Sequence, residues 1–213
     1  MHMNRRKALK NIGLSAGYIA ATPALISLLQ SCRQEIILDW LPELLSVDEG
    51  KALEQIVDLI IPETDTPGAK SLHIPMFIDK YVNNAFEKEK SQIFSQGMIT
   101  IFKELGITTK KTIDDVAIEE YDALLAKYLR LPKEKQREYR KEINKLKSVN
   151  DIKTLSKESI SFNFLSSVRS LSIFGFKTSE EIAKNVLNYL PVPGEYVGCD
   201  SVKNLTGGKD WAL

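Results

Sequence analysis

Histidine and cysteine are scarce in this chain of 213 residues, which contains only His2, His73, Cys32 and Cys199. Two thiols exclude a disulfide-rich scaffold and any four-thiolate zinc or iron–sulfur site. Two histidines 71 positions apart argue against a multi-histidine metal or haem centre. The chain therefore has few side chains suited to redox or metal-dependent chemistry, and we expect no cofactor, metal or catalytic site in it.

Glycine and proline are also few, with 11 and 8 residues, which excludes a collagen-like or low-complexity chain. The sequence contains no glycine-rich phosphate-binding or dinucleotide-binding motif, and neither the G-x-S-x-G nor the H-E-x-x-H catalytic motif. Hydrophobic residues make up 43% and charged residues 27%, which is ordinary for a globular protein. These values predict one globular domain with a short additional segment.

Positive charge is concentrated at the N-terminus. The formal net charge is +1, but residues 1–31 contain four basic residues and no acidic one. The remainder, with 25 basic and 28 acidic residues, is slightly acidic. Because domains that bind nucleic acid are usually strongly basic, nucleic acid is not an expected partner.

The first 32 residues have the organisation of an export signal. The run Asn4-Arg5-Arg6-Lys7-Ala8-Leu9-Lys10 resembles a twin-arginine motif, although Ala8 stands where an aromatic residue is usual. An uncharged stretch follows and ends at Leu29-Gln30-Ser31-Cys32, which resembles a lipobox whose cysteine is lipidated. An uncleaved anchor helix is the alternative, since about 20 apolar residues can span a bilayer. We expect residues 1–32 to be the signal, 33–213 the mature domain, and the protein to be periplasmic and membrane-associated.

Hydrophobic residues recur at helical spacing through most of the mature domain. Helices are expected over residues 46–61, 75–86, 93–105, 112–129, 133–147 and 156–173, with a further helix starting at 178. Helix boundaries are indicated by a Ser46–Glu49 capping box, Pro75, Gly106 and Thr112. No sustained alternation of period two is present. The predicted fold class is therefore all-α, a single helical domain of about five to seven helices with an extended C-terminal tail.

Residues 133–147 differ from the other helical segments in their charge. They contain seven basic and three acidic side chains, and only Tyr139, Ile143 and Leu146 are apolar. A solvated helix with a thin contact to the core is the simpler interpretation. A basic surface for acidic lipid or for a partner protein is the alternative.

Few residues are candidates for catalysis. Asp58, Glu63 and Asp65 are close in sequence, but Glu63 and Asp65 flank a loop with proline and glycine, where acidic residues normally accept turn hydrogen bonds. His73 has no second histidine or thiolate near it in the sequence, so we expect a loop or interface residue rather than a general base.

Two loops have distinctive compositions. In the first, Thr64-Asp65-Thr66-Pro67-Gly68-Ala69, we expect Pro67-Gly68 to form a type II turn with positive φ at Gly68, and the Asp65 carboxylate to accept loop amides. The second, Pro191-Val192-Pro193-Gly194-Glu195-Tyr196-Val197-Gly198-Cys199, favours an extended, pre-ordered segment. Such a segment can lie along another protein or along its own domain.

Both loops carry a family resemblance. Ile60-Ile61-Pro62-x-Thr64-Asp65-Thr66-Pro67-Gly68-Ala69, followed by Phe77-Ile78-Asp79, resembles the signature of the gluconate 2-dehydrogenase subunit 3 family. Gly175-Phe176-x-Thr178-Ser179-Glu180 and Pro191-Val192-Pro193-Gly194-x-Tyr196-x-Gly198-Cys199 resemble its C-terminal half. Lys177 and Glu181 depart from the family pattern, where an aromatic and an aliphatic residue are expected.

The resemblance implies an accessory role in a dehydrogenase complex. It implies a large flavoprotein partner of the glucose–methanol–choline type, which binds FAD and oxidises a sugar, sugar acid or alcohol, and often a haem-containing cytochrome subunit. This chain would stabilise the catalytic subunit and accompany it during export, and it would reach the membrane through a lipid anchor or the complex. A free-standing periplasmic lipoprotein without a dehydrogenase is the alternative, and an independent enzyme is disfavoured for want of a site.

The two loops are the predicted contact surface for the partner. Its candidate residues are Thr64, Asp65, Thr66, Pro67, Gly68, Pro191, Pro193, Gly194, Tyr196 and Cys199. If Cys32 is lipidated, Cys199 is the remaining thiol of an exported chain, and a disulfide to the partner is one expected fate. A buried, inert thiol is the other.

Overall fold

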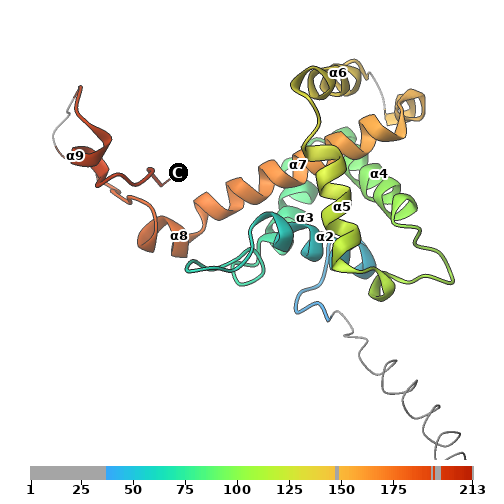
Figure 1. The fold of residues 1–213 in the computed structure, drawn as a ribbon, viewed down its shortest axis with the longest axis horizontal. Coiled ribbons are helices and arrows are strands. Elements are labelled where there is room, and N and C mark those ends of the chain that lie inside the picture. The colour runs from blue at the N-terminus through green and yellow to red at the C-terminus, as the bar shows by residue number, and fades with distance from the viewer. Residues whose placement is uncertain (1–36, 147–148, 193, 195–197, 213) are drawn as a thin grey trace, which may run out of the picture. The chain divides into compact units, whose positions relative to one another are not determined.

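The computed structural model describes residues 37–146, 149–192, 194 and 198–212, and it is helical in most of them (Figure 1). The α-helices are α2 (Val47–Ile60), α3 (Ile74–Ala85), α4 (Lys88–Glu104), α5 (Ile118–Leu129), α6 (Lys133–Asn144), α7 (Lys157–Thr178), α8 (Glu180–Asn185) and α9 (Val202–Thr206). Two 3-10 helices, η1 (Ile113–Asp115) and η2 (Val149–Thr154), lie between them. The described residues contain no strand, which confirms the all-α prediction.

The described helices exceed the expected range of five to seven by one. The additional helix is α9, whose five residues are too short to produce a periodic hydrophobic signal. The fourth expected helix also begins later than predicted. Thr112 caps η1 instead, through a hydrogen bond from its amide to Asp115 Oδ2 at 2.9 Å, and α5 begins only at Ile118.

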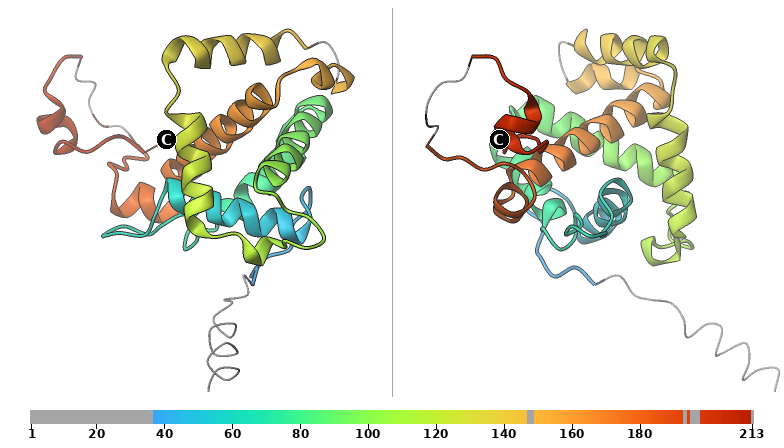
Figure 2. Two further views of the ribbon diagram at one scale, coloured as in Figure 1. Left: turned by 45° about the vertical axis from the view of Figure 1, so that its right-hand side comes forward. Right: turned by 60° about the vertical axis from the view of Figure 1, so that its left-hand side comes forward.

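Helix α7 is the central element of the domain. It is the longest described helix, with 22 residues, and it packs against α2, α3, α4, α5 and α6 (Figures 1 and 2). The predicted apolar faces of these helices meet around it in one core. Its fully buried side chains include Leu53, Ile56, Ile78, Val82, Met98, Ile101, Tyr121, Phe162, Leu165 and Val168.

Two glycines allow helices to approach α7 closely. A Cβ atom on Gly97 of α4 would lie 2.6 Å from the Cβ of Phe164, and one on Gly175 would lie 2.8 Å from Cδ1 of Phe77 in α3. Neither glycine has a positive φ, so their requirement is for space between helices rather than for backbone freedom. The packing therefore explains why glycine occurs in the interior of two helices, where it otherwise costs about 1 kcal/mol relative to alanine.

The predicted C-terminal tail begins where α7 ends. Ser179 is both the C-cap of α7 and the N-cap of α8, so the chain changes direction there. Beyond α8, the Asn188 amide donates to the Asp210 carbonyl at 2.9 Å, and the Ala212 amide donates to the Asn188 carbonyl at 3.1 Å. The tail is thus a looped segment with α9 in it, and its two ends are held together by backbone hydrogen bonds.

Candidate functional site

The loop between α2 and α3 is closed at its base by backbone hydrogen bonds. The Ala69 amide donates to the Ile61 carbonyl at 2.9 Å, and the Thr64 amide donates to the Thr66 carbonyl at 3.1 Å. The Thr66 amide lies 3.4 Å from the Thr64 hydroxyl. Within this turn, the side-chain hydrogen bonds are therefore made by Thr64 and Thr66 rather than by Asp65. The expectation that the Asp65 carboxylate accepts loop amides is not met among the described residues.

Gly68 is needed in this loop for a different reason than the sequence indicated. Its φ is not positive, so the predicted type II turn at Pro67-Gly68 is wrong. Gly68 is instead buried against the start of the loop, where a Cβ atom would lie 2.6 Å from the Glu63 amide nitrogen and 2.9 Å from its Cα. Of the loop residues proposed to contact a partner, Thr64 and Asp65 are exposed, whereas Thr66 and Pro67 are half-buried.

The acidic residues near this loop have structural contacts. Glu63 accepts a hydrogen bond from the Ser71 hydroxyl, which links the two sides of the loop. His73 adopts a left-handed conformation (φ 51°) before α3, and its Nδ1 lies 3.9 Å from Oδ2 of Asp39. Within the described residues, no group of three or more His, Cys, Asp or Glu side chains is arranged to hold a metal ion.

Asp79 holds the segment before α2 against α3. Its carboxylate is fully buried and accepts three successive amides, from Glu43 at 2.7 Å, Leu44 at 3.2 Å and Leu45 at 3.0 Å. Hydrogen bonds to an ionised carboxylate are stronger than neutral ones, and burial makes their loss costly. The sequence motif included Asp79 but indicated no role for it, because its partners lie more than 30 positions away.

A second carboxylate, which is half-buried, joins three helices. Glu104 of α4 accepts hydrogen bonds from Tyr128 of α5 at 2.7 Å, from Lys127 of α5 at 2.9 Å, and from the Ser161 hydroxyl of α7. Burial raises the pKa of Glu104, but the hydrogen bonds from Ser161, Tyr128 and Lys127 outweigh it and hold the pKa below its ordinary value. All four groups are satisfied by one another, so the cluster stabilises the packing of α4, α5 and α7.

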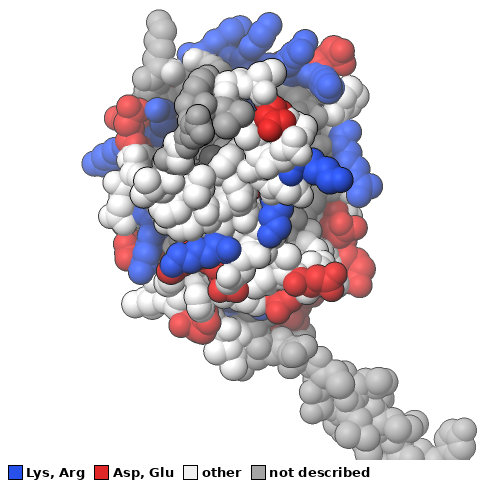
Figure 3. Space-filling model, turned by 90° about the vertical axis from the view of Figure 1, so that its left-hand side faces the viewer, with Lys and Arg blue, Asp and Glu red and all other residues white. Residues whose placement is uncertain are grey.

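The C-terminal segment, the part of the chain beyond α8, exposes six large apolar side chains. Its large exposed side chains are Tyr189, Leu190, Val192, Val202, Leu205 and Trp211. Figure 3 shows the side of the molecule on which α8 and α9 lie in Figure 1, and much of its central area is uncharged. Lys177 pairs with Asp210, which ties the end of α7 to the end of the segment.

Three of the five tail residues that are predicted to contact a partner lie among the described residues. Pro191, Gly194 and Cys199 are exposed, and the Cys199 thiol is free among the described residues. Pro193 and Tyr196 lie outside the described residues, as do Arg5, Arg6 and Cys32 of the predicted signal. No helix in the described ranges is both long enough and apolar enough to cross a membrane.

The loop and the C-terminal segment leave the domain at neighbouring positions. The loop ends at α3, whose first residue Ile74 lies beside Gly175, near the end of α7. Phe77 of α3 stacks obliquely on the exposed Phe174, with ring centroids 6.0 Å apart. The end of the loop therefore lies beside the C-terminal part of α7, from which the chain continues through α8 into the C-terminal segment.

Comparison with protein-family models gives a match to gluconate 2-dehydrogenase subunit 3 over residues 47–194. The chain belongs to this family. The match begins at α2 and covers the loop, Asp79, Gly97 and Gly175, so the family region includes the whole helical core. No curated protein and no solved structure matched the chain.

The limits of the family match separate two parts of the C-terminal segment. Tyr189, Leu190 and Val192 lie inside the matched region, whereas Cys199, α9 and Trp211 lie beyond it. As its name states, the family is a subunit of a gluconate dehydrogenase, which implies a separate catalytic subunit. The exposed apolar residues at the end of the match are thus the strongest candidates for contact with such a subunit.

Proposed function

We propose that this chain is the accessory small subunit of an exported dehydrogenase complex, in which a flavoprotein partner binds FAD and oxidises a sugar, sugar acid or alcohol. Its task in this proposal is to stabilise the catalytic subunit and to accompany it during export. Membership of the gluconate 2-dehydrogenase subunit 3 family supports the assignment. The twin-arginine-like residues Arg5 and Arg6 support export to the periplasm, and Cys32 would provide a lipid anchor.

The observation that carries the proposal is the apolar surface of the C-terminal segment. Leu190 is 50% exposed and Val192 is 77% exposed, and they lie on either side of Pro191 within the region that matches the family. Monomeric soluble proteins rarely expose large contiguous apolar patches, and such patches mark sites of protein association. A partner that covers these residues removes their apolar surface from water, which is the main driving force of most protein association.

Cys199 adds a covalent option to this contact. Its thiol is exposed and lies a few residues beyond Val192, so a cysteine of the partner could reach it if the segment forms the interface. A haem-containing cytochrome would complete the complex as an electron acceptor. In this proposal the chain itself contributes shape and export, and the redox steps take place in its partners.

Affinity purification of the tagged full chain from its native cell tests the proposal. We expect a large subunit with flavin absorbance to co-purify, and Leu190→Ser to reduce the flavin recovered per mole of chain at least about tenfold, as for an interfacial hot spot. Leu41→Ser is the matched control, because Leu41 is 78% exposed but lies before α2. Recovery of the chain without a flavoprotein, or an equal loss with both variants, contradicts the proposal.

A further inference from the structure

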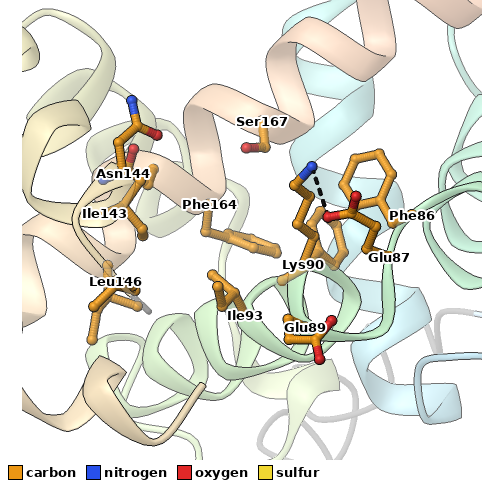
Figure 4. Close-up of a pocket in the computed structure, with 13 residues that line it drawn as sticks. Phe86, Glu87, Glu89, Lys90, Ile93, Ile143, Asn144, Leu146, Phe164 and Ser167 are labelled. Atoms are coloured by element: carbon orange, nitrogen blue, oxygen red, sulfur yellow. Dashed lines mark ion pairs between the residues drawn. The ribbon is translucent and has the colours of Figure 1, made fainter. Parts of the chain in front are cut away.

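A pocket of about 520 Å³ lies between α4, α6 and α7, away from the C-terminal segment. It is lined on the α4 side by Ile93 and Phe94, on the α7 side by Ile160 and Phe164, and by Ile143 and Leu146 at the end of α6 (Figure 4). This volume falls within the range of about 300–1,000 Å³ that is typical of small-molecule sites.

Four aliphatic side chains contribute to this pocket rather than to the core. Ile93, Ile143, Leu146 and Ile160 are half-buried, and none of them belongs to the core cluster or packs against it. Figure 4 shows Ile143 and Leu146 on one side of the cavity and Phe164 and Ile93 on the other. In the basic segment, Tyr139 alone makes the predicted core contact, so the other two apolar residues line a cavity that the core does not fill.

One end of the pocket opens towards a cation. A second hollow of about 380 Å³ shares Phe86, Asn163 and Ser167 with the pocket and is lined also by Arg140 of α6. The Arg140 guanidinium lies 3.4 Å from the Ser166 hydroxyl and 5.7 Å from the centre of the Phe162 ring, and no carboxylate pairs with it within the described ranges. Its planar group has five N–H donors, which suit a carboxylate or phosphate.

The acidic residues of the pocket do not neutralise this cation. Glu87 is paired with Lys90 at 3.0 Å, as the dashed line in Figure 4 shows, and Glu89 is an exposed side chain of the first turn of α4. The pocket thus has an aliphatic interior, and the hollow beside it is lined by a guanidinium without a carboxylate partner and by the Ser167 hydroxyl. This distribution matches a molecule with an apolar chain and one anionic head.

We propose that the pocket binds a single-chain lipid with an anionic headgroup. The alkyl chain lies among Ile93, Ile143, Leu146 and Ile160, and the headgroup accepts hydrogen bonds from Arg140 and Ser167. Burial of the alkyl chain supplies most of the affinity, because the hydrophobic effect grows with the apolar area removed from water. The guanidinium selects the anionic head over a neutral one, through charge-assisted hydrogen bonds.

Titration of the purified full chain with a fluorescent polyene fatty acid, below its micellar concentration, tests the proposal. We expect saturable binding, with displacement by an unlabelled fatty acid or alkyl phosphate of similar length. The relative strength of the two competitors distinguishes a carboxylate from a phosphate head, and either result supports the site. A fatty alcohol that competes as well as the acid overturns the role of Arg140, and absence of saturable binding overturns the site.

Two kinds of variant make the test specific. Arg140→Gln should weaken binding of the acid about tenfold while leaving the alcohol unchanged. Arg137→Gln is the matched control, because Arg137 is exposed on the same helix and does not line either hollow. Ile143→Trp fills the cavity and should abolish binding with the helical circular dichroism retained, and Leu146→Trp repeats this test at a second position. Equal losses with Arg140→Gln and Arg137→Gln, or unchanged binding to folded tryptophan variants, contradict the proposal.

Discussion

Individual residues of the family signature act through packing and hydrogen bonds inside the domain. Gly68 permits the loop to approach its own start, Gly175 permits α3 to approach α7, and Asp79 fixes the chain before α2. Each role depends on atoms that are distant in the sequence. For this reason the sequence indicated that glycine is required at position 68, but the predicted reason, a positive φ, was wrong. The requirement is for space beside the Glu63 backbone.

The role of Asp79 leads to a stability prediction. Asp79→Asn replaces one of the two carboxylate oxygens by an NH2 group, which cannot accept a hydrogen bond from the Glu43–Leu45 amides, and we expect the unfolding free energy to fall by about 2 kcal/mol. Urea unfolding of the full chain measures this change. Asp122→Asn is the control, because Asp122 is an exposed carboxylate on α5. Similar unfolding midpoints for the two variants would show that the buried acceptor is unimportant.

At the scale of elements, the Glu104 cluster determines how α4, α5 and α7 stay together as pH changes. The folded-state pKa of Glu104 lies below its ordinary value of 4.5, so the ionised carboxylate is favoured by folding. Its contribution is fully present above pH 4.5 and is lost as pH falls through the lower folded-state pKa. Acidification should therefore weaken this junction of three helices.

A pH series of unfolding measurements tests this prediction. Glu104→Gln should lower the unfolding free energy by about 2 kcal/mol at neutral pH, because hydrogen bonds to a charged acceptor become neutral ones. The difference from the native chain should shrink as pH falls below 4.5. Glu134→Gln, on an exposed part of α6, should show no such trend. A difference that is constant with pH contradicts the assignment.

The sequence predicted elements well where periodicity and caps agreed. The Ser46–Glu49 capping box is present, with the Ser46 amide donating to the Glu49 carboxylate at 2.8 Å, and Pro75 lies in the first turn of α3. Short elements such as η1 and α9 carry too few residues for a periodic signal. The pocket between α4, α6 and α7 could not be predicted, because the pattern of Ile93 and Ile160 shows only that these positions are apolar, not which surface they face.

At the scale of the whole molecule, the described domain combines a well-packed core with an apolar surface at one end. The core needs nothing from outside, since its buried side chains form one cluster around α7. The C-terminal segment instead exposes Leu190, Val192 and Trp211, as expected for a chain whose final packing is completed in a complex. The proposed division of labour between this chain and a catalytic subunit rests on that contrast and on the family match.

Separation of the native complex into its chains tests this division most directly. After the subunits are resolved under mild conditions, flavin absorbance and alcohol oxidation are measured for each of them. The account predicts that both reside with the large subunit and that this chain, although folded, has neither. A flavin bound to this chain alone, with turnover of an alcohol, would contradict it.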